Sequence, residues 1–180
     1  VNMAQSTNDT FPTAMRMAAR RQAADLIHAL SGLGDAFAEK GAEFKEVVKA
    51  GRTHLQDAVP VTLGQEFAAY ATTLRQAREA VVFAARCLEE LGIGGSAAGT
   101  GLNTHPRFRS RVVEKISLYT GIGFRPAADL RASMQSNFPI ALLSSSLRLL
   151  ALEVSRICND LRLLGSGPAT GLMEISLPAV

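Results

Sequence analysis

The sequence predicts an all-α fold in which a few long helices form a bundle. Apolar residues recur at steps of three and four over three long stretches, residues 13–50, 63–91 and 137–164, which is the period of a helix with a buried face. β-Branched residues do not cluster with period two over any useful length, so no strand is expected. Glycine-rich and proline-containing segments separate the long stretches, as loops do.

The first long helix is expected over residues 13–50, after a polar opening of ten residues. Asn, Asp, Ser and Thr in that opening are residues that cap helices, and Pro12 lies where a first helical turn tolerates proline. Gly32, Gly34 and Gly41 each weaken the helix by about 1 kcal/mol relative to alanine. The stretch can therefore kink or break at these glycines.

Helices and glycine-rich breaks alternate in the rest of the chain. A helix is expected over residues 63–91, a loop over 92–101, a short helix over 106–120, and one or two turns over 129–135. Apolar residues occupy nearly the whole circumference of the last helix, 137–164, which predicts burial on most sides. Helices about 42 Å long leave apolar surface that further helices must cover, so a homo-oligomer is expected.

Composition and charge exclude several classes of partner. With 47% apolar residues, 19% charged residues and a net charge of +3, the chain is globular, and its scattered cations predict no nucleic-acid surface. No apolar run approaches the ~20 residues of a membrane span and no signal-peptide pattern is found, so no membrane contact is expected. Cys87 and Cys158 lack metal-ligand spacing, which predicts buried free thiols, a cytoplasmic protein and no metal site.

A first candidate binding group lies just before the first helix. Ser6, Thr7 and Asn8 supply two hydroxyls and an amide where free backbone N–H groups and the positive end of the helix dipole favour an anion. N-capping of the helix by one of these side chains, with the others solvated, is the alternative explanation.

A second candidate group is Thr53 and His54, within the polar stretch 51–60. This stretch combines a cation, a hydroxyl, an imidazole, an amide and a carboxylate between two predicted helices, and is expected to be a loop that carries function. The neighbouring polar side chains can fix the tautomer and orientation of the imidazole. A solvated or simply hydrogen-bonded histidine is the alternative.

The glycine-rich stretch 94–103 is not expected to bind a nucleotide. It follows a helix instead of a strand and lacks the lysine of a P-loop, so close packing of its backbone against a neighbour or a ligand is the expected use. The remaining histidines, His28 and His105, have no motif around them and are expected to be structural.

Several of these segments, in the same order along nearly the whole chain, resemble the aspartase/fumarase superfamily. They are QSTND at residues 5–9, GRTHLQDAVPVTLGQEF at 51–67, GTGLN at 99–103, and residues 159–177. The resemblance implies a mainly α-helical central domain of a homotetramer, with active sites where three subunits meet and no cofactor. It also implies reversible elimination to fumarate: a base removes the proton beside a carboxylate, an aci-carboxylate forms, and an amine or hydroxide leaves. Hydrogen-bond donors aimed at the carboxylates stabilise such an intermediate.

The resemblance assigns five residues to the binding of a small dicarboxylate substrate: Ser6, Thr7, Asn8, Thr53 and His54. For His54, carboxylate binding is favoured over the alternative assignment, proton transfer. Thr100 and Asn103 belong to a stretch near the site and receive no role.

The resemblance favours an aspartate ammonia-lyase, because residues 6–8 and the run 158–162 look closest to those enzymes. The alternatives are fumarate hydratase, another fumarate-forming lyase of the superfamily, and a non-catalytic helical assembly module. Ala169 stands where relatives usually have arginine after Gly-Pro. This departure leaves the choice between aspartate, malate and another substituted succinate open.

Residues 1–180 are expected to form one helical domain that is a fragment of a longer enzyme. The superfamily has a substrate-binding Thr-Ser segment that would precede Val1, and a Gly-Ser-Ser loop that would follow Val180 and supply the serine base. The isolated chain is therefore expected to be inactive.

Overall fold

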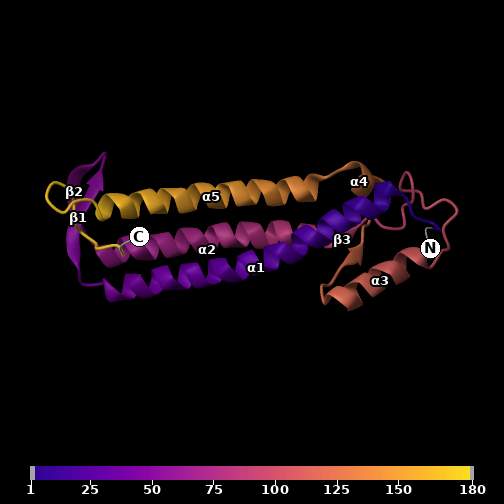
Figure 1. Ribbon diagram of the computed structural model, residues 1–180, viewed down its shortest axis with the longest axis horizontal. Coiled ribbons are helices and arrows are strands. Elements are labelled where there is room, and N and C mark those ends of the chain that lie inside the picture. Colours follow the sequence, from indigo (N-terminus) through magenta and orange to yellow (C-terminus); the bar gives the residue numbers. More distant parts are fainter. Residues whose placement is uncertain (1–2, 179–180) are drawn as a thin grey trace. The chain divides into compact units, whose positions relative to one another are not determined.

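The computed structural model describes residues 3–178 (Figure 1). These residues divide into two compact units. Unit 1 consists of residues 3–27 and 80–146, and unit 2 of residues 28–79 and 147–178. Three long helices have residues in both units: α1 (Thr7–Glu43), α2 (Leu63–Cys87) and α5 (Phe138–Leu164). The predicted mainly α-helical class is confirmed, whereas the single domain stays a prediction.

Unit 1 packs short elements around a small apolar core. The parallel strands β3 (Glu90–Leu91) and β4 (Arg125–Pro126) pair beside α3 (Phe108–Thr120), and α4 (Leu130–Gln135) follows. The core consists of four buried side chains, Leu91, Ile93, Val113 and Phe124. The helices α3 and α4 confirm the two short helical segments expected from the sequence.

Both short helices of unit 1 have defined ends. Gly121 ends α3 in the left-handed conformation, with φ of 68°, and its N–H donates to the carbonyl of Ser117, which is the usual glycine C-cap. The Asp129 carboxylate begins α4 by accepting hydrogen bonds from the N–H groups of Arg131 and Ala132.

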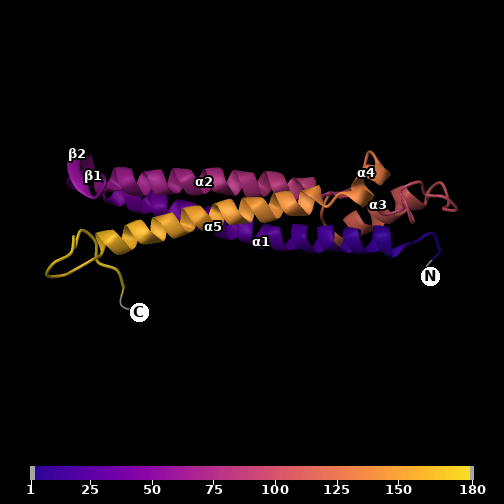
Figure 2. The ribbon, with the colours of Figure 1, turned by 90° about the horizontal axis from the view of Figure 1, so that it is seen from above.

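In unit 2, parts of α1, α2 and α5 lie side by side (Figure 2). Four aromatic rings pack where α1 and the residue after it meet α2, and the rings in contact have centroids 5.3–5.9 Å apart: Phe37, Phe44, Phe67 and Tyr70. A Cβ atom on Gly64 would lie 2.4 Å from the carbonyl oxygen of Gly41. Gly64 therefore allows α1 and α2 to approach closely. The break that the glycines of the first helix allow is absent, because α1 continues through Gly32, Gly34 and Gly41 to Glu43.

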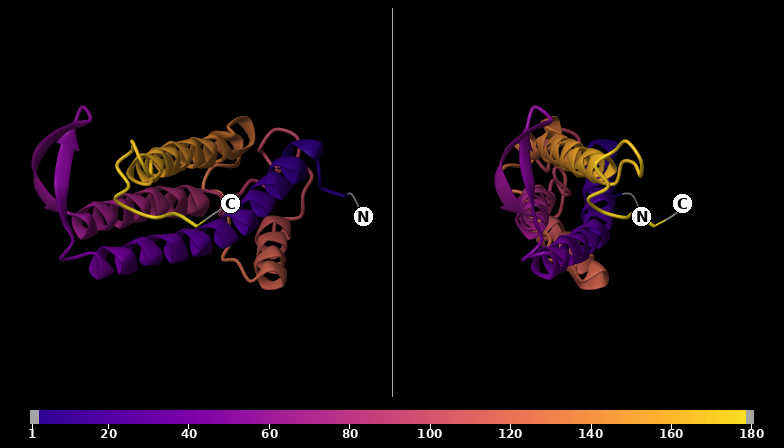
Figure 3. Two further views of the ribbon diagram at one scale, coloured as in Figure 1. Left: turned by 60° about the vertical axis from the view of Figure 1, so that its left-hand side comes forward. Right: turned by 90° about the vertical axis from the view of Figure 1, so that its left-hand side faces the viewer.

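The segment predicted as a helix end followed by a polar loop is a β-hairpin, so that prediction is wrong (Figure 3). Strand β1 (Val48–Thr53) pairs antiparallel with β2 (Gln56–Thr62), with a register shift at Gly51/Arg52. A Cβ atom on Gly51 would lie 2.9 Å from the carbonyl oxygen of Val59, so the glycine permits close pairing. The β-branched residues of this segment stabilise strands, but the run was too short to reveal period two.

The expectation that α5 is buried on most sides is also wrong. Its side chains in unit 2 are buried along one stripe at a spacing of seven, through Leu150, Ile157 and Leu164, while Leu149 and Leu152 are 59% and 57% exposed. By length and composition α5 could span a membrane, although no apolar run of that length was found in the sequence; the absence of membrane contact stays a prediction. One such helix is weak evidence for a span, because core helices of soluble proteins pass the same test.

The two cysteines only partly match the prediction of buried free thiols. Both are free, but Cys87 is half-buried and Cys158 is exposed. Cys158 lies on α5, next to the buried Ile157 but outside the buried stripe.

Candidate functional site

Ser6, Thr7 and Asn8 stand at the start of α1, in unit 1. The carbonyl oxygen of Ser6 accepts hydrogen bonds from the N–H groups of Asp9 (3.2 Å) and Thr10 (3.0 Å), and its hydroxyl oxygen accepts one from the N–H of Asn8 (3.3 Å). Ser6 thus caps the helix, as the alternative explanation required. Thr7 and Asn8 remain exposed, so capping by Ser6 and binding by its neighbours are compatible.

Asp9 ties this segment to the glycine-rich loop and was not singled out by the sequence. Its side chain is 1% exposed. One carboxylate oxygen accepts from the N–H of Ser6 at 2.9 Å, and the other accepts from the N–H groups of Gly94 at 3.2 Å and Ser96 at 3.0 Å. The spacing of Ser6 and Asp9 is that of a capping box with Asp in place of Glu, and was the available signal.

The glycine-rich loop packs closely against α4, as predicted. A Cβ atom on Gly95 would lie 2.4 Å from the Met134 sulfur, and one on Gly99 would lie 2.6 Å from the Arg131 Cα atom. Asn8 Nδ2 donates to the carbonyl oxygen of Ala97 on the same loop, at 3.0 Å. Because Gly95 and Gly99 have no side chains, the loop fits between α4 and the start of α1.

A cavity of about 400 Å³ opens beside Asn8. Its lining combines loop and α4 residues: Asn8, Ala97, Ala98, Arg131, Met134 and Gln135. The Arg131 guanidinium lies 3.3 Å from the Asp129 carboxylate. Thr100 and Asn103, expected near the site, lie on the same loop but do not line this cavity.

Thr53 and His54 lie at the tip of the hairpin, in unit 2. His54 and Leu55 form its two-residue turn with φ of 52° and 61°. Such a turn usually contains Asn-Gly, because a left-handed conformation costs other residues about 1–2 kcal/mol each. Thr53 precedes this turn, and both Thr53 and His54 are exposed. Their side chains are therefore accessible at the tip of the hairpin.

An ion-pair network below the tip holds the hairpin to the segment after α5. The Lys49 ammonium lies 2.8 Å from both the Glu66 and the Glu174 carboxylates. The Arg52 guanidinium lies 2.7 Å from Glu174 and 3.1 Å from Asp57. The Lys49 side chain is only 8% exposed, so its charge depends on these partners.

The network shifts the protonation equilibria of both central groups. Burial opposes ionisation of Glu174, but hydrogen bonds and charge from Lys49 and Arg52 outweigh it and lower the pKa of the carboxyl. Burial likewise opposes the charge of Lys49, but Glu174 and Glu66 outweigh it and raise the pKa of the ammonium. Each group therefore stabilises the charged form of the other.

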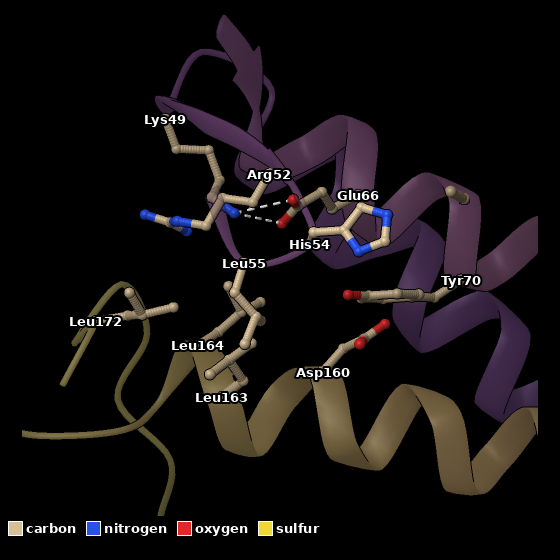
Figure 4. A pocket seen from close by; sticks show the side chains of 11 residues that line it. Lys49, Arg52, His54, Leu55, Glu66, Tyr70, Asp160, Leu163, Leu164 and Leu172 are labelled. Atoms are coloured by element: carbon tan, nitrogen blue, oxygen red, sulfur yellow. Dashed lines mark hydrogen bonds and ion pairs between the residues drawn. The ribbon is translucent and has the colours of Figure 1, made fainter. Parts of the chain in front are cut away.

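His54 lines a cavity of about 460 Å³ beside this network (Figure 4). Figure 4 shows the Tyr70 hydroxyl and the Asp160 carboxylate pointing toward one another, with the His54 ring close by. Burial raises the pKa of the Tyr70 phenol, and the nearby Asp160 and Glu66 carboxylates raise it further. The Arg156 guanidinium lies 5.9 Å from the centre of the Tyr70 ring. The cavity thus combines an imidazole, a phenol kept neutral and several charged groups.

The structure therefore gathers the predicted residues into two groups, one in each unit. Sequence reasoning missed Lys49, Glu66, Tyr70 and Asp160, and it missed Glu174 because more than one hundred residues separate it from the hairpin. His105 accepts a hydrogen bond from the N–H of Arg107 at 3.1 Å, which agrees with a structural role. Among residues 3–178, His, Cys, Asp and Glu side chains form no group of three that could hold a metal ion.

These features define a mainly α-helical protein that presents hydroxyl, amide and imidazole groups at a helix start and at a hairpin tip. A family model described as lyase matches residues 1–180. The chain is 49% identical over 179 residues to fumarate hydratase class II of Saccharolobus solfataricus, and covers 41% of it. It is 49% identical over 180 residues to aspartate ammonia-lyase of Pseudomonas fluorescens, and covers 38% of it. Each match includes 99% of this chain.

Solved structures of relatives have the same fold as this chain. A fumarate lyase:delta crystallin from Brucella melitensis, in a crystal structure bound to cobalt, matches 99% of this chain with a TM-score of 0.90 and 43% identity. The chain covers 39% of that protein, so it spans about two fifths of the length of these relatives. The chain belongs to the lyase family, within the aspartase/fumarase superfamily.

Proposed function

We propose that the protein carrying this chain releases ammonia from aspartate to give fumarate. The observation that carries the proposal is the arrangement at the start of α1, where Thr7 and Asn8 are exposed, Asn8 lines a cavity, and the Asp9 carboxylate holds the backbone N–H of Ser6 just before them. Backbone N–H groups and the helix dipole at this position favour a carboxylate. Five relatives named aspartate ammonia-lyase, at 46–49% identity, support the choice of reaction.

In this proposal the residues of the chain bind the two carboxylates of the substrate. Ser6, Thr7 and Asn8 serve one group of contacts, and Thr53 and His54 of a different subunit serve the other, because the superfamily resemblance implies active sites where three subunits meet. Removal of the proton beside a carboxylate sends the electron pair into that carboxylate, and the adjacent C–N bond then breaks. Donors already in place stabilise the added negative charge. His54 acts as a carboxylate donor, and proton transfer by its imidazole is the alternative.

Fumarate hydratase is the second candidate function. The relative from Saccharolobus solfataricus carries that name at the same 49% identity, and a hydroxide leaving group needs the same two carboxylate contacts. The two candidates differ only in the leaving group.

An assay of the intact protein separates the two. Fumarate formation is followed by its ultraviolet absorbance, with aspartate or malate as substrate, and free ammonia is measured in parallel. The proposal expects fumarate and ammonia in equal amounts from aspartate and a much slower reaction with malate. Fast turnover of malate alone would establish the hydratase instead. Turnover of neither would leave another fumarate-forming lyase of the superfamily or the non-catalytic assembly module.

We also infer that the protein works as a homotetramer in the cytoplasm. The exposed leucines of α5 support self-association, because an apolar face of this kind is normally covered, and the free thiols support a reducing compartment. Leu152→Glu should shift the mass measured by light scattering from a tetramer to smaller species. Leu118→Glu, at an exposed leucine of α3, is the matched control. A tetramer that survives Leu152→Glu would remove α5 from the interface.

A further inference from the structure

We propose that Asp9 is a positioning residue that holds the segment Ser6–Asn8 and the glycine-rich loop in one fixed arrangement. This inference rests on the proposed function, because it gives Asp9 a task in substrate binding without contact to the substrate. It concerns unit 1 alone.

The carboxylate bridges two pieces of backbone that are about 85 residues apart in sequence. One oxygen accepts from Ser6 and the other from Gly94 and Ser96, at 2.9–3.2 Å. Hydrogen bonds from N–H groups to a carboxylate are stronger than those between neutral groups, and the 1% exposure of Asp9 removes competition from water. Both oxygens are needed, since each serves a different segment.

The helix face that carries Asp9 is fixed at a second point. Asp9, Thr13 and Arg16 follow at steps of four and three and are all buried. The Arg16 guanidinium donates to the carbonyl oxygens of Glu90, Ser133 and Ser136. The start of α1 is thereby attached to β3, just before the loop, and to the end of α4.

The loop is enclosed from the other side by α4. Gly95 and Gly99 approach Met134 and Arg131 so closely that a Cβ atom would clash. The loop has little freedom to move toward α4, and Asp9 supplies the hydrogen bonds that keep it against α1. The Ala97 carbonyl then meets Asn8 Nδ2, so the orientation of the Asn8 side chain depends on the position that Asp9 gives the loop.

Asp9→Asn is the sharpest test, because it keeps the size of the side chain but leaves one acceptor oxygen in place of two. Whichever way the amide turns, its NH₂ group faces a backbone N–H. Asp25→Asn is the matched control: Asp25 lies on the same helix and in the same unit, is exposed, and loses the same charge. Both variants are made in the intact protein, and circular dichroism checks that their helix content is unchanged.

Two readouts are compared between Asp9→Asn and Asp25→Asn. Hydrogen exchange of peptides covering residues 92–101 should be faster by about tenfold or more in Asp9→Asn, the scale of a lost charge-assisted hydrogen bond. The KM for the amino-acid substrate should rise by about tenfold, with a smaller fall in kcat. Asp25→Asn should match the wild type in both measurements.

Unchanged exchange in Asp9→Asn, or faster exchange with an unchanged KM, would overturn the proposal. Should Asp9→Asn lose helix content, Asp9→Glu replaces it: this variant keeps the charge but displaces the carboxylate, and is also expected to raise exchange and KM. Wild-type values for Asp9→Glu would equally overturn the proposal. Failure of the wild-type protein to eliminate from any dicarboxylate would reject the proposed function, and the exchange data would still show whether Asp9 holds the loop.

Discussion

The two groups of candidate substrate-binding residues are held by different kinds of interaction. In unit 1, the segment Ser6–Asn8 is fixed by backbone N–H groups that converge on the buried Asp9 carboxylate. In unit 2, Thr53 and His54 lie at the tip of a hairpin whose turn is strained, and ion pairs from strand β1 attach the hairpin to Glu174. The first arrangement is rigid because it uses main chain and close glycine packing. The second depends on the ionisation of partly exposed side chains, so it should respond to pH.

The largest effect is expected in the glycine-packed region of unit 1. Gly99→Ala places a Cβ atom 2.6 Å from the Arg131 Cα atom, at a φ of +83°, so both a backbone clash and conformational strain oppose folding. We expect the free energy of unfolding to fall by about 3 kcal/mol. Chemical denaturation measures it. Gly123→Ala, where nothing lies within 4 Å of the added Cβ, should have little effect, and equal losses in both variants would refute close packing of the loop.

The second effect tests the ion-pair network of unit 2. Glu174→Gln removes the negative charge that Lys49 and Arg52 share, and should lower the free energy of unfolding by about 1–2 kcal/mol. Glu46→Gln is the control, since Glu46 is exposed and meets Lys45 only at 3.8 Å. Thermal unfolding of the three proteins measures the difference. A Glu174→Gln protein as stable as the control would mean that the hairpin is held by other contacts.

The third prediction concerns the dependence of stability on pH, and it follows from the shifted pKa values of Glu174 and Lys49. The pKa of Glu174 is lowered, so its stabilisation is complete above its unfolded value of about 4.3 and is lost as pH falls through the lower folded value. The pKa of Lys49 is raised, so its contribution is complete below about 10.4 and is lost at more alkaline pH. Wild type and Glu174→Gln should therefore differ in stability at neutral pH and converge in acid. A constant difference down to the acid limit would contradict this assignment.

The smallest effect is expected at the hairpin turn. Leu55 is exposed and has a φ of 61°, a conformation that glycine adopts without strain. Leu55→Gly should raise the free energy of unfolding by about 0.5–1 kcal/mol. Leu102→Gly, at an exposed leucine outside the residues with positive φ, lacks this strain to relieve and should not be stabilised. A destabilised Leu55→Gly would show that the leucine side chain contributes more than its backbone strain costs.

The helices were predictable from the sequence because periodicity reports a buried face directly. α2, α3 and α5 begin or end within a few residues of their expected bounds. The hairpin was not predictable in this way, because its turn is His54-Leu55 instead of the usual Asn-Gly and its glycine and proline suggested a loop. The exposure of Leu149 and Leu152 was missed because apolar residues on all sides of a helix do not say which partner covers each side.

Some of the polar site residues could likewise be identified from the sequence, and others could not. Ser6, Thr7, Asn8, Thr53 and His54 stood out through their types and local spacing, and the superfamily resemblance gave them a role. Asp9 carried a weak local signal in the capping-box spacing. Glu174 carried none, because its partners Lys49 and Arg52 lie far away in sequence and only the folded chain brings them together.

Substrate kinetics of His54 variants in the intact protein test most directly whether this chain supplies carboxylate-binding groups. His54→Ala should raise the KM or lower kcat by about tenfold, as expected for a lost charge-assisted hydrogen bond. His54→Gln keeps a donor and should retain most of the activity, whereas a proton-transfer role would make it as defective as His54→Ala. His28→Ala, at an exposed histidine of the same unit, should match the wild type. Wild-type kinetics for His54→Ala would remove the hairpin tip from the site and contradict the account.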